Sequence, residues 1–263
     1  MKLLINPSLN HDIWMKKTKL ATRQEYSNER HKMILDDIRS IGDTYSFWIE
    51  NPELRRSLLT ENKSPKSIRK EARKGIDGVH DGWYFLCQKG AYGNFVETLN
   101  PEILKRVSGH ILHEKKPQFR DKSVTLNYLH YTPPAPGKIS QKIGDAINRI
   151  KDFYLNKKEP LVAAITAHLE IAAIQPFMDG NKRVARLIQD RILHDVGLPP
   201  VVIQAGEGKY YRDLLGRALP AYSEKDIGGQ KEFYDYCASK VNNGLDSMLG
   251  DLQEEPYLIS YLI

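Results

Sequence analysis

The stretch I-Q-P-F-M-D-G-N-K-R-V-A-R, residues 174–186, restricts the fold of this chain more than any other. On both sides of it, in residues 160–174 and 184–196, apolar residues recur at helical intervals. Pro176 and Gly180 both favour an end to the first helix. The stretch therefore predicts two helices joined by a tight loop, with the loop leading directly into the start of the second helix.

The start of this second helix has the residues of an anion site. Asn181 is a favourable N-cap, and the first helical turn leaves backbone N–H groups and partial positive charge for an anion. Lys182 adds a charge, and Arg183 and Arg186 share a helix face that can bind phosphate oxygens. Asp179 supplies a hard oxygen ligand suited to Mg²⁺. We expect a nucleotide-phosphate site, with a solvated loop and a basic helix start as the alternative.

The spelling of this stretch resembles the signature of the Fic family, H-P-F-x-[D/E]-G-N-[G/K]-R-x-x-R, at every position but one. Gln175 stands where the family has its histidine, and Lys182 replaces the commoner glycine, as in the Doc-like branch. The resemblance continues through Pro133-Pro134 upstream and Tyr210-Tyr211 downstream. It implies a mostly α fold, a Fic-like helical bundle with one short β-hairpin that acts as a flap.

The resemblance also implies a role for each residue of the site. Nucleotide binding falls to Gly180, Asn181, Lys182, Arg183, Arg186, Tyr210 and Tyr211. Asn181 and Arg183 would position the transferred phosphate, and Arg186 would bind the γ-phosphate. Asp179 would hold the cofactor Mg²⁺ together with ATP or another nucleotide.

Gln175 leaves this predicted site without its catalytic base. A glutamine amide has no titratable group near neutral pH, and a general base typically accelerates a reaction by about 10²–10⁴-fold. His168 lies about 10 Å upstream along its helix, too far for a direct replacement. His130 on the flap is better placed, although an exposed hairpin histidine is the simpler interpretation. His110 and His113 have no metal-site spacing and are interpreted as surface residues.

Residues 123–131, S-V-T-L-N-Y-L-H-Y, are β-prone and are followed by Thr132-Pro133-Pro134. We expect one short hairpin here in an otherwise helical chain. The resemblance implies that this hairpin is a flap on which a target protein docks as an added strand. The flap residues of interest are Val124, Thr125, Leu126 and His130.

A second motif lies in the N-terminal part. Residues 57–62, S-L-L-T-E-N, fit the inhibitory pattern [S/T]-x-x-x-E-[G/N] of self-inhibited Fic proteins. Ser57 and Glu61 would share one helix face. The resemblance implies that Glu61 pairs with Arg186 and withdraws it from the γ-phosphate, whereas the alternative is a solvated glutamate at a helix end.

Composition and charge narrow the class of ligand. The 263 residues carry a formal charge of +6 with a pI near 9.1, and acidic residues interrupt the basic runs. This favours a small anionic ligand and argues against nucleic acid. There is no apolar run of membrane-spanning length and no signal peptide, so we expect a cytoplasmic protein, or one exported without a recognisable signal. Cys87 and Cys237 have no metal-like spacing and are expected to be buried.

These inferences combine into one organisation and a leading function. We expect an N-terminal inhibitory region at 1–98, a Fic-like core at 99–225 and a C-terminal helix and tail at 226–263, whose apolar end suits a homo-oligomer. The leading function is AMP transfer from ATP to a protein hydroxyl, impaired or altered by Gln175. A non-catalytic module that binds a nucleotide or a partner is one alternative. A transferase or lyase acting on another phosphate compound is the other.

Overall fold

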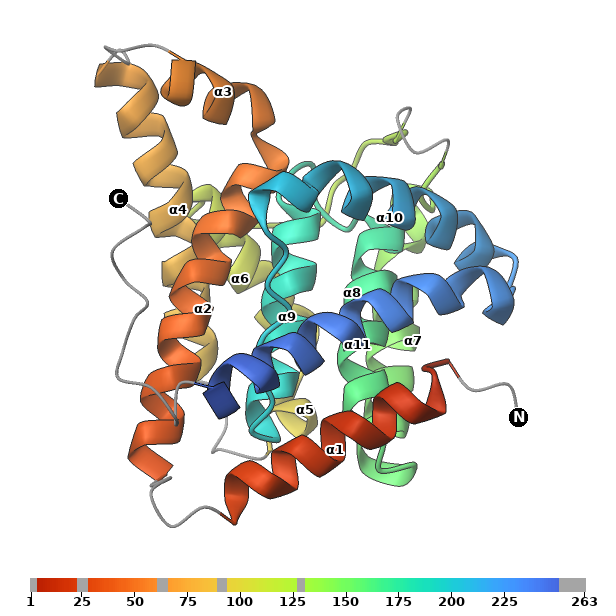
Figure 1. The fold of residues 1–263 in the computed structure, drawn as a ribbon. Helices are drawn as coiled ribbons and strands as arrows, with labels where there is room; N and C mark the ends of the chain where they lie inside the picture. Colours follow the sequence, from red (N-terminus) through yellow and green to blue (C-terminus); the bar gives the residue numbers. More distant parts are fainter. Residues whose placement is uncertain (1–3, 23–27, 61–65, 89–93, 127–130, 251–263) are drawn as a thin grey trace.

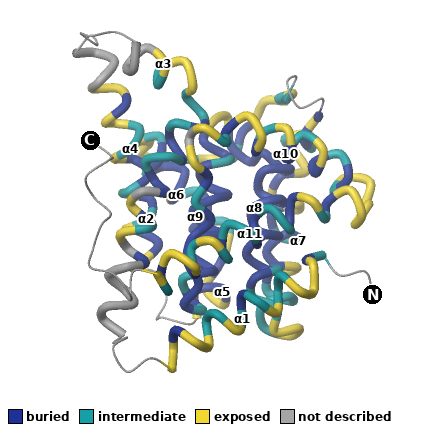
Figure 2. Tube along the Cα trace, viewed as in Figure 1, coloured by how far each residue is buried: buried dark blue, intermediate teal, exposed yellow. Residues whose placement is uncertain are grey.

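Two adjacent helices, α8 (Pro160–Ile174) and α9 (Asn181–Asp195), occupy the centre of the computed structural model (Figure 1). Nearly all of their residues are buried, as the dark tube in Figure 2 shows. Helix α8 is apolar on every side because other helices cover it all round. The predicted pair of helices around a tight loop is confirmed. The second helix begins three residues earlier than its apolar pattern suggested.

The structure describes residues 4–22, 28–60, 66–88, 94–126 and 131–250. Within these ranges the chain is helical and contains no named strand. The remaining helices are α1 (Pro7–Ala21), α2 (Asn28–Glu50), α3 (Pro52–Thr60), α4 (Lys66–Cys87), α5 (Phe95–Thr98), α6 (Pro101–Leu112), α7 (Ile139–Lys151), α10 (Gly208–Ser223) and α11 (Ile227–Gly250). Short 3₁₀ turns lie at Pro136–Lys138 and Ala205–Glu207, and a π-helical turn at Asp152–Asn156 continues α7.

The outer helices cover the central pair from different sides. Helices α7 and α10 pack against α8, whereas α2, α4 and α6 pack against α9. Helix α11 lies on α10 and runs beside α1, which is far away in the sequence (Figure 1). The mostly α helical bundle inferred from the sequence is therefore confirmed.

Helix α2 ends beside the loop between α8 and α9, and two features fix it there. The ring of Phe47 lies on Gly75 of α4, where a Cβ atom would be only 2.0 Å from the ring, so this approach requires glycine. Buried Asp43 pairs with Arg39, and its carboxylate lies 3.0 Å from Nδ1 of His80 of α4. These contacts hold the C-terminal half of α2 against α4.

The predicted hairpin is not confirmed. Among the described residues it is reduced to a single antiparallel bridge, in which Leu126 and Tyr131 exchange backbone hydrogen bonds of 2.9 and 3.4 Å. Val124 and Thr125 precede the bridge without pairing in a strand, and His130 lies outside the described residues. One bridge is too short for a ladder, because a strand needs successive paired residues.

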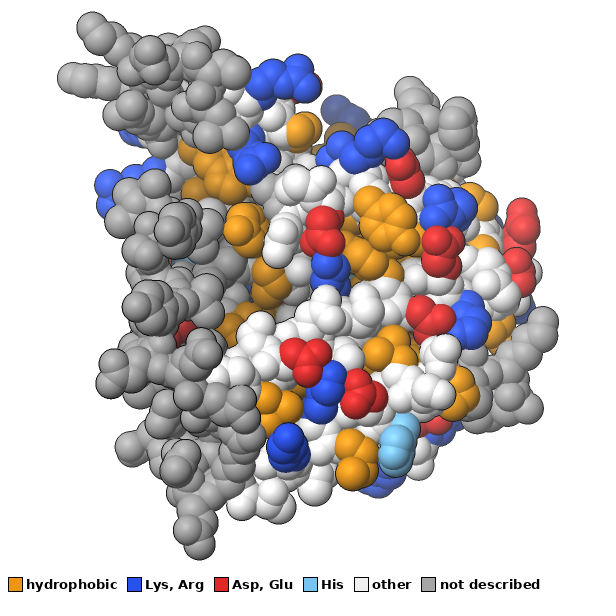
Figure 3. Space-filling view, viewed as in Figure 1, with side chains coloured by type: hydrophobic (Ala, Val, Ile, Leu, Met, Phe, Trp, Pro, Cys, Tyr) orange, Lys and Arg blue, Asp and Glu red, His pale blue; other side chains and the backbone are white. Residues whose placement is uncertain are grey.

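Surface features agree with the sequence in part. Cys237 is buried as predicted, but Cys87 is exposed because α4 ends there. On the face drawn in Figure 3, acidic and basic side chains are interspersed. Exposed ion pairs of the described residues include Arg217 with Glu232 at 2.9 Å. No helix in the described ranges has the length and apolar character needed to cross a membrane.

The central pair should dominate the stability of the fold. Leu187 of α9 is fully buried, and we expect Leu187→Ala to lower the free energy of unfolding by about 2–5 kcal/mol. Met15 of α1 is 56% exposed, so Met15→Ala should change it by less than about 0.5 kcal/mol. Urea denaturation of both variants measures the difference. Equal losses would show that α9 is not part of the core.

Candidate functional site

The loop between α8 and α9 is shaped by left-handed backbone conformations at its two ends. Gln175 follows α8 with φ 48°, and Gly180 precedes α9 with φ 75°. The side-chain Nε2 of Gln175 donates to Ala172 O at 2.7 Å, so this amide caps its own helix. Gly180 fits because glycine adopts positive φ without steric cost. The sequence suggested Asn181 as the N-cap of α9, but the N-cap is Gly180.

Asn181 closes the loop with its side chain. Its Oδ1 accepts from Phe177 N and its Nδ2 donates to Phe177 O, both at 2.8 Å. Phe177 itself is buried against Phe119. Both polar atoms of the Asn181 amide therefore hold the loop in shape, which orients the start of α9 towards the neighbouring cavity.

A cavity of about 200 Å³ lies over this loop. It brings together the end of α2, the bridge at the predicted flap, the loop and the first turn of α9. Its lining consists of Glu50, Leu126, Gln175, Met178, Asp179, Gly180, Asn181, Lys182 and Arg183. Six of the nine residues predicted for catalysis, nucleotide binding and metal binding thus line one cavity, together with Leu126 of the predicted flap.

Two charged residues in this lining have capacity for a ligand. Arg183 donates to Asp179 at 3.1 Å, but its buried Nε has no hydrogen-bond partner among the described residues. A buried donor without a partner is rare in proteins and is satisfied when a phosphate oxygen binds. The side chain of Asp179 is 75% exposed at the rim, where its oxygens are accessible to Mg²⁺.

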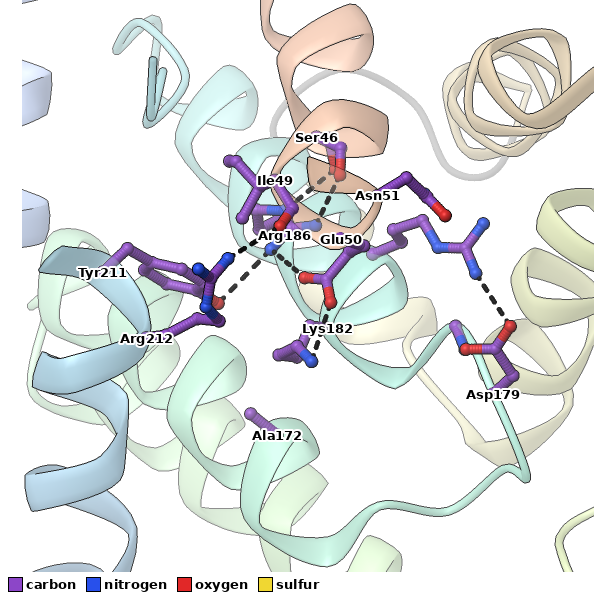
Figure 4. Close-up of polar contacts among 12 residues, drawn as sticks. Ser46, Ile49, Glu50, Asn51, Ala172, Asp179, Lys182, Arg186, Tyr211 and Arg212 are labelled. Atoms are coloured by element: carbon purple, nitrogen blue, oxygen red, sulfur yellow. Dashed lines mark hydrogen bonds and ion pairs between the residues drawn. The ribbon is translucent and has the colours of Figure 1, made fainter. Parts of the chain in front are cut away.

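Arg186 is buried, and every nitrogen of its guanidinium donates a hydrogen bond (Figure 4). Nε donates to Ser46 Oγ at 2.8 Å, and Nη2 donates to Ser46 O at 2.9 Å. Nη1 donates to Glu50 Oε1 at 3.2 Å and to the Tyr211 hydroxyl at 3.3 Å. Helix α2 therefore supplies three of the four oxygens that accept from Arg186, which is the arginine predicted to bind a γ-phosphate.

Glu50 connects two cations of α9. One carboxylate oxygen accepts from Arg186, and the other lies 2.7 Å from Lys182 Nζ. Burial of Glu50 acts to raise its pKa, but the charges of Arg186 and Lys182 outweigh burial and leave the pKa below its ordinary value. Glu50 is thus a carboxylate at neutral pH and occupies the place at which an anionic ligand would meet both cations.

The predicted inhibitory pair, Ser57 and Glu61, stays a prediction, but a second match to its pattern lies at Arg186. Residues 46–51, S-F-W-I-E-N, fit the same inhibitory pattern as residues 57–62, and it is Glu50 that contacts Arg186. Glu61 lies outside the described residues, and Ser57 lies in α3 with a side chain that is not described. The sequence contains the match at residues 46–51, but the pattern alone does not indicate which helix packs on α9.

The two tyrosines predicted at the nucleotide differ in exposure. Tyr210 is 50% exposed and stays a candidate contact. Tyr211 is 0% exposed, and its hydroxyl lies between Arg186 and His168. In this conformation Tyr211 is therefore not accessible to a ligand. It faces inwards because α10 packs this side against α8 and α11.

None of the described histidines lies at the cavity. His168 is fully buried, and burial together with the charge of Arg186 lowers its pKa to about 3. His110 stacks on Phe85, and His113 follows the end of α6. His168 is therefore unable to replace the missing base, in agreement with its distance along the helix.

The residues present fit a divalent cation only if a ligand completes the site. No group of three acidic, histidine or cysteine side chains comes together within the described ranges. Mg²⁺ is commonly held by one or two carboxylates together with the phosphates of its substrate. Asp179 matches that pattern.

Comparison with known proteins agrees with this geometry. The model of the "Fic/DOC family" matches residues 98–193. Two relatives named "Protein adenylyltransferase Fic", from Drosophila willistoni and Nematostella vectensis, are 31% identical over 165 residues and 32% over 152. These matches cover 62% and 56% of this chain, and 31% and 33% of the relatives. The chain thus spans about a third of the length of the curated relatives it matches.

Solved structures share the fold. A Fic domain-containing signaling protein from Bacteroides thetaiotaomicron has a TM-score of 0.74 at 17% identity, covering 94% of this chain and all of that one. A fragment of Fic-1 from C. elegans has a TM-score of 0.70 at 17% identity, covering 93% and 72%. Residues 98–193, which contain α8, α9 and the loop between them, thus match the domain of the Fic/DOC family, and the solved structures share the fold.

The ion pairs of Glu50 should make stability depend on pH. Since the folded-state pKa of Glu50 is lowered, its contribution is present above the ordinary value of 4.5 and is lost as the pH falls through the lowered value. We expect Glu50→Gln to reduce the free energy of unfolding by about 1–3 kcal/mol at pH 7 and by less at pH 3.5. Urea denaturation at both pH values measures this.

Glu53→Gln is the matched control for this prediction. Glu53 is an exposed carboxylate at the start of α3, next to Arg56, and its loss should change stability by less than about 0.5 kcal/mol. A destabilisation by Glu50→Gln that stays constant between pH 7 and pH 3.5 would contradict the ionised pair.

Proposed function

We propose that this chain is a Fic-type nucleotidyltransferase that binds ATP with Mg²⁺ and whose transfer of AMP to a protein hydroxyl is limited by Gln175. The observation that carries the proposal is the cavity at the start of α9, whose lining includes Lys182 and Arg183, with an unpartnered buried donor on Arg183. A further cation, Arg186, lies behind this lining and contacts Glu50. Curated relatives named as adenylyltransferases support the reaction type.

Each residue of the site would have a separate role in such a transfer. The hydroxyl oxygen of the target attacks the α-phosphorus of ATP, the bond to the β-phosphate oxygen breaks, and pyrophosphate leaves. Arg183 and the first turn of α9 would bind the transferred phosphate, and Arg186 would bind the γ-phosphate. Asp179 would hold Mg²⁺, which supplies charge neutralisation for the pyrophosphate. Positioning and charge are thus available from this chain.

The site lacks a group that accepts the proton of the attacking hydroxyl. Gln175 lines the cavity at the position of the family histidine, but its amide donates to Ala172 O and has no titratable group. A histidine fits the same backbone, because the left-handed region at φ 48° is enriched in histidine compared with most residues. We therefore expect Gln175→His to supply the missing base.

We propose further that Glu50 makes the N-terminal region self-inhibitory, in place of the predicted Glu61. Its carboxylate neutralises Arg186 and Lys182 together, so a triphosphate must displace it to reach Arg186. The flap, as the docking site of a target protein, stays a prediction that rests on Leu126 in the cavity lining.

A second candidate function is nucleotide or partner binding without catalysis. One observation favours it, since the Gln175 amide is already engaged as a helix cap and the cavity keeps its cations. The two functions differ in whether a histidine restores transfer.

Four forms of the chain separate these functions: unmodified, Gln175→His, Glu50→Gln, and both substitutions together. Each is incubated with ATP labelled at the α-phosphate, Mg²⁺ and a cell lysate. We expect protein labelling to rise by about 10²–10⁴-fold with Gln175→His and to be strongest in the double variant. Asp179→Asn in the double variant is the control and should abolish labelling.

Two outcomes would contradict the proposed transfer function or the proposed role of Gln175. Labelling as strong with Gln175 as with histidine would show that the base is supplied elsewhere. A double variant that binds ATP but labels nothing would favour the non-catalytic module.

A further inference from the structure

A buried chain of hydrogen bonds leads from Arg186 into the protein core. The Arg186 guanidinium lies 3.3 Å from the Tyr211 hydroxyl, which lies 2.8 Å from Nε2 of His168. Nδ1 of His168 in turn pairs with Oε1 of Gln189. All four side chains are buried, and they come from α8, α9 and α10. Figure 4 shows Tyr211 directed at Arg186 from the side opposite Asp179.

The chemistry of the four groups fixes the direction of every bond. A guanidinium only donates, so the Tyr211 oxygen accepts from Arg186. The hydroxyl hydrogen is then directed to His168 Nε2, which must be the unprotonated nitrogen. Nδ1 of His168 therefore carries its hydrogen and donates to Gln189. The chain has one consistent polarity, with Arg186 as its outermost donor.

This polarity does not change near neutral pH. Burial and the positive charge of Arg186 lower the pKa of His168 to about 3, so its ring stays neutral. Burial also raises the pKa of Tyr211, which keeps its hydroxyl hydrogen. The acceptor for Arg186 is thus a permanent part of the core.

Arg186 consequently has two groups of partners that belong to different parts of the protein. Ser46 and Glu50 come from α2, the helix that we propose to be inhibitory. Tyr211 comes from α10, which packs against α8 and α11. Displacement of α2 would remove the first group and leave the second, so Arg186 would keep one fixed partner.

We propose that Tyr211, His168 and Gln189 are positioning residues for Arg186, which hold its guanidinium beside Glu50 of the cavity lining so that it can bind the terminal phosphate of a nucleoside triphosphate when Glu50 is displaced. This inference rests on the proposed nucleotide site. It gives a function to a histidine and a tyrosine that contact no ligand themselves.

Tyr211→Phe tests the proposal with the smallest change, the loss of one hydroxyl. The affinities for ATP and ADP, each with Mg²⁺, are measured by calorimetry in Glu50→Gln protein with and without Tyr211→Phe. We expect the Kd for ATP to rise about five- to tenfold, because one hydrogen bond that orients Arg186 is lost. The Kd for ADP should stay within about twofold, since ADP has no γ-phosphate.

Tyr222→Phe is the matched control. The Tyr222 hydroxyl accepts from Arg149 Nη2 at 3.0 Å, so this variant also removes a tyrosine–arginine bond, but one that lies at a different cavity. It should change neither affinity. Equal losses for ATP and ADP in Tyr211→Phe, or no loss, would overturn the inference while the proposed function stands. Failure of Glu50→Gln protein to bind either nucleotide would overturn both.

Nitrogen NMR of the histidine rings gives a second measurement, made on the unmodified chain and on both tyrosine variants. We expect His168 to be protonated at Nδ1 only, with no titration between pH 5 and pH 8. Tyr211→Phe should move the Nε2 resonance, whereas Tyr222→Phe should not. A hydrogen on Nε2 of His168 in the unmodified chain would reverse the polarity and overturn the inference.

Discussion

The buried guanidinium of Arg186 is the group on which the rest of the site depends. A cation removed from water is costly unless an anion or several acceptors compensate it. Here Glu50, Ser46 and Tyr211 do so, and they come from two helices at opposite ends of the chain. The same requirement can be met by a phosphate. The position of α2 and the binding of an anionic ligand are therefore linked through one side chain.

Lys182 strengthens this link. Its ammonium group lies 2.7 Å from the carboxylate of Glu50. Glu50 thus compensates two cations, and its removal would leave both without a carboxylate. An anionic ligand that displaces Glu50 gains both charges at once. This arrangement favours a ligand with several negative charges, such as a triphosphate.

The central helices and the loop were predictable because their signals are local. Gly180, Pro176 and the apolar spacing of residues 160–174 act over a few residues, so the turn and the start of the second helix could be predicted from them. The cavity lining follows from the same stretch, since Gln175, Asp179 and Lys182 lie within it. The mostly helical bundle follows from the helical periodicity and from the family resemblance.

The features that could not be predicted from the sequence are contacts between distant segments. The inhibitory pattern occurs twice, and the choice of Glu50 depends on α2 packing against α9, which spacing does not reveal. Tyr211 turns inwards because α10 buries that face, although its neighbour Tyr210 is exposed. The predicted hairpin is unconfirmed, since the described residues contain one antiparallel bridge there, and β propensity does not determine how many residues pair.

The most direct test of the exchange at Arg186 is the affinity for ATP with and without the competing carboxylate. ATP with Mg²⁺ is titrated by calorimetry into the unmodified chain and into Glu50→Gln protein. Competition predicts that Glu50→Gln lowers the Kd at least about tenfold, which corresponds to about 1.4 kcal/mol. Equal affinities in the two proteins would contradict the central claim that Glu50 and a phosphate compete for Arg186.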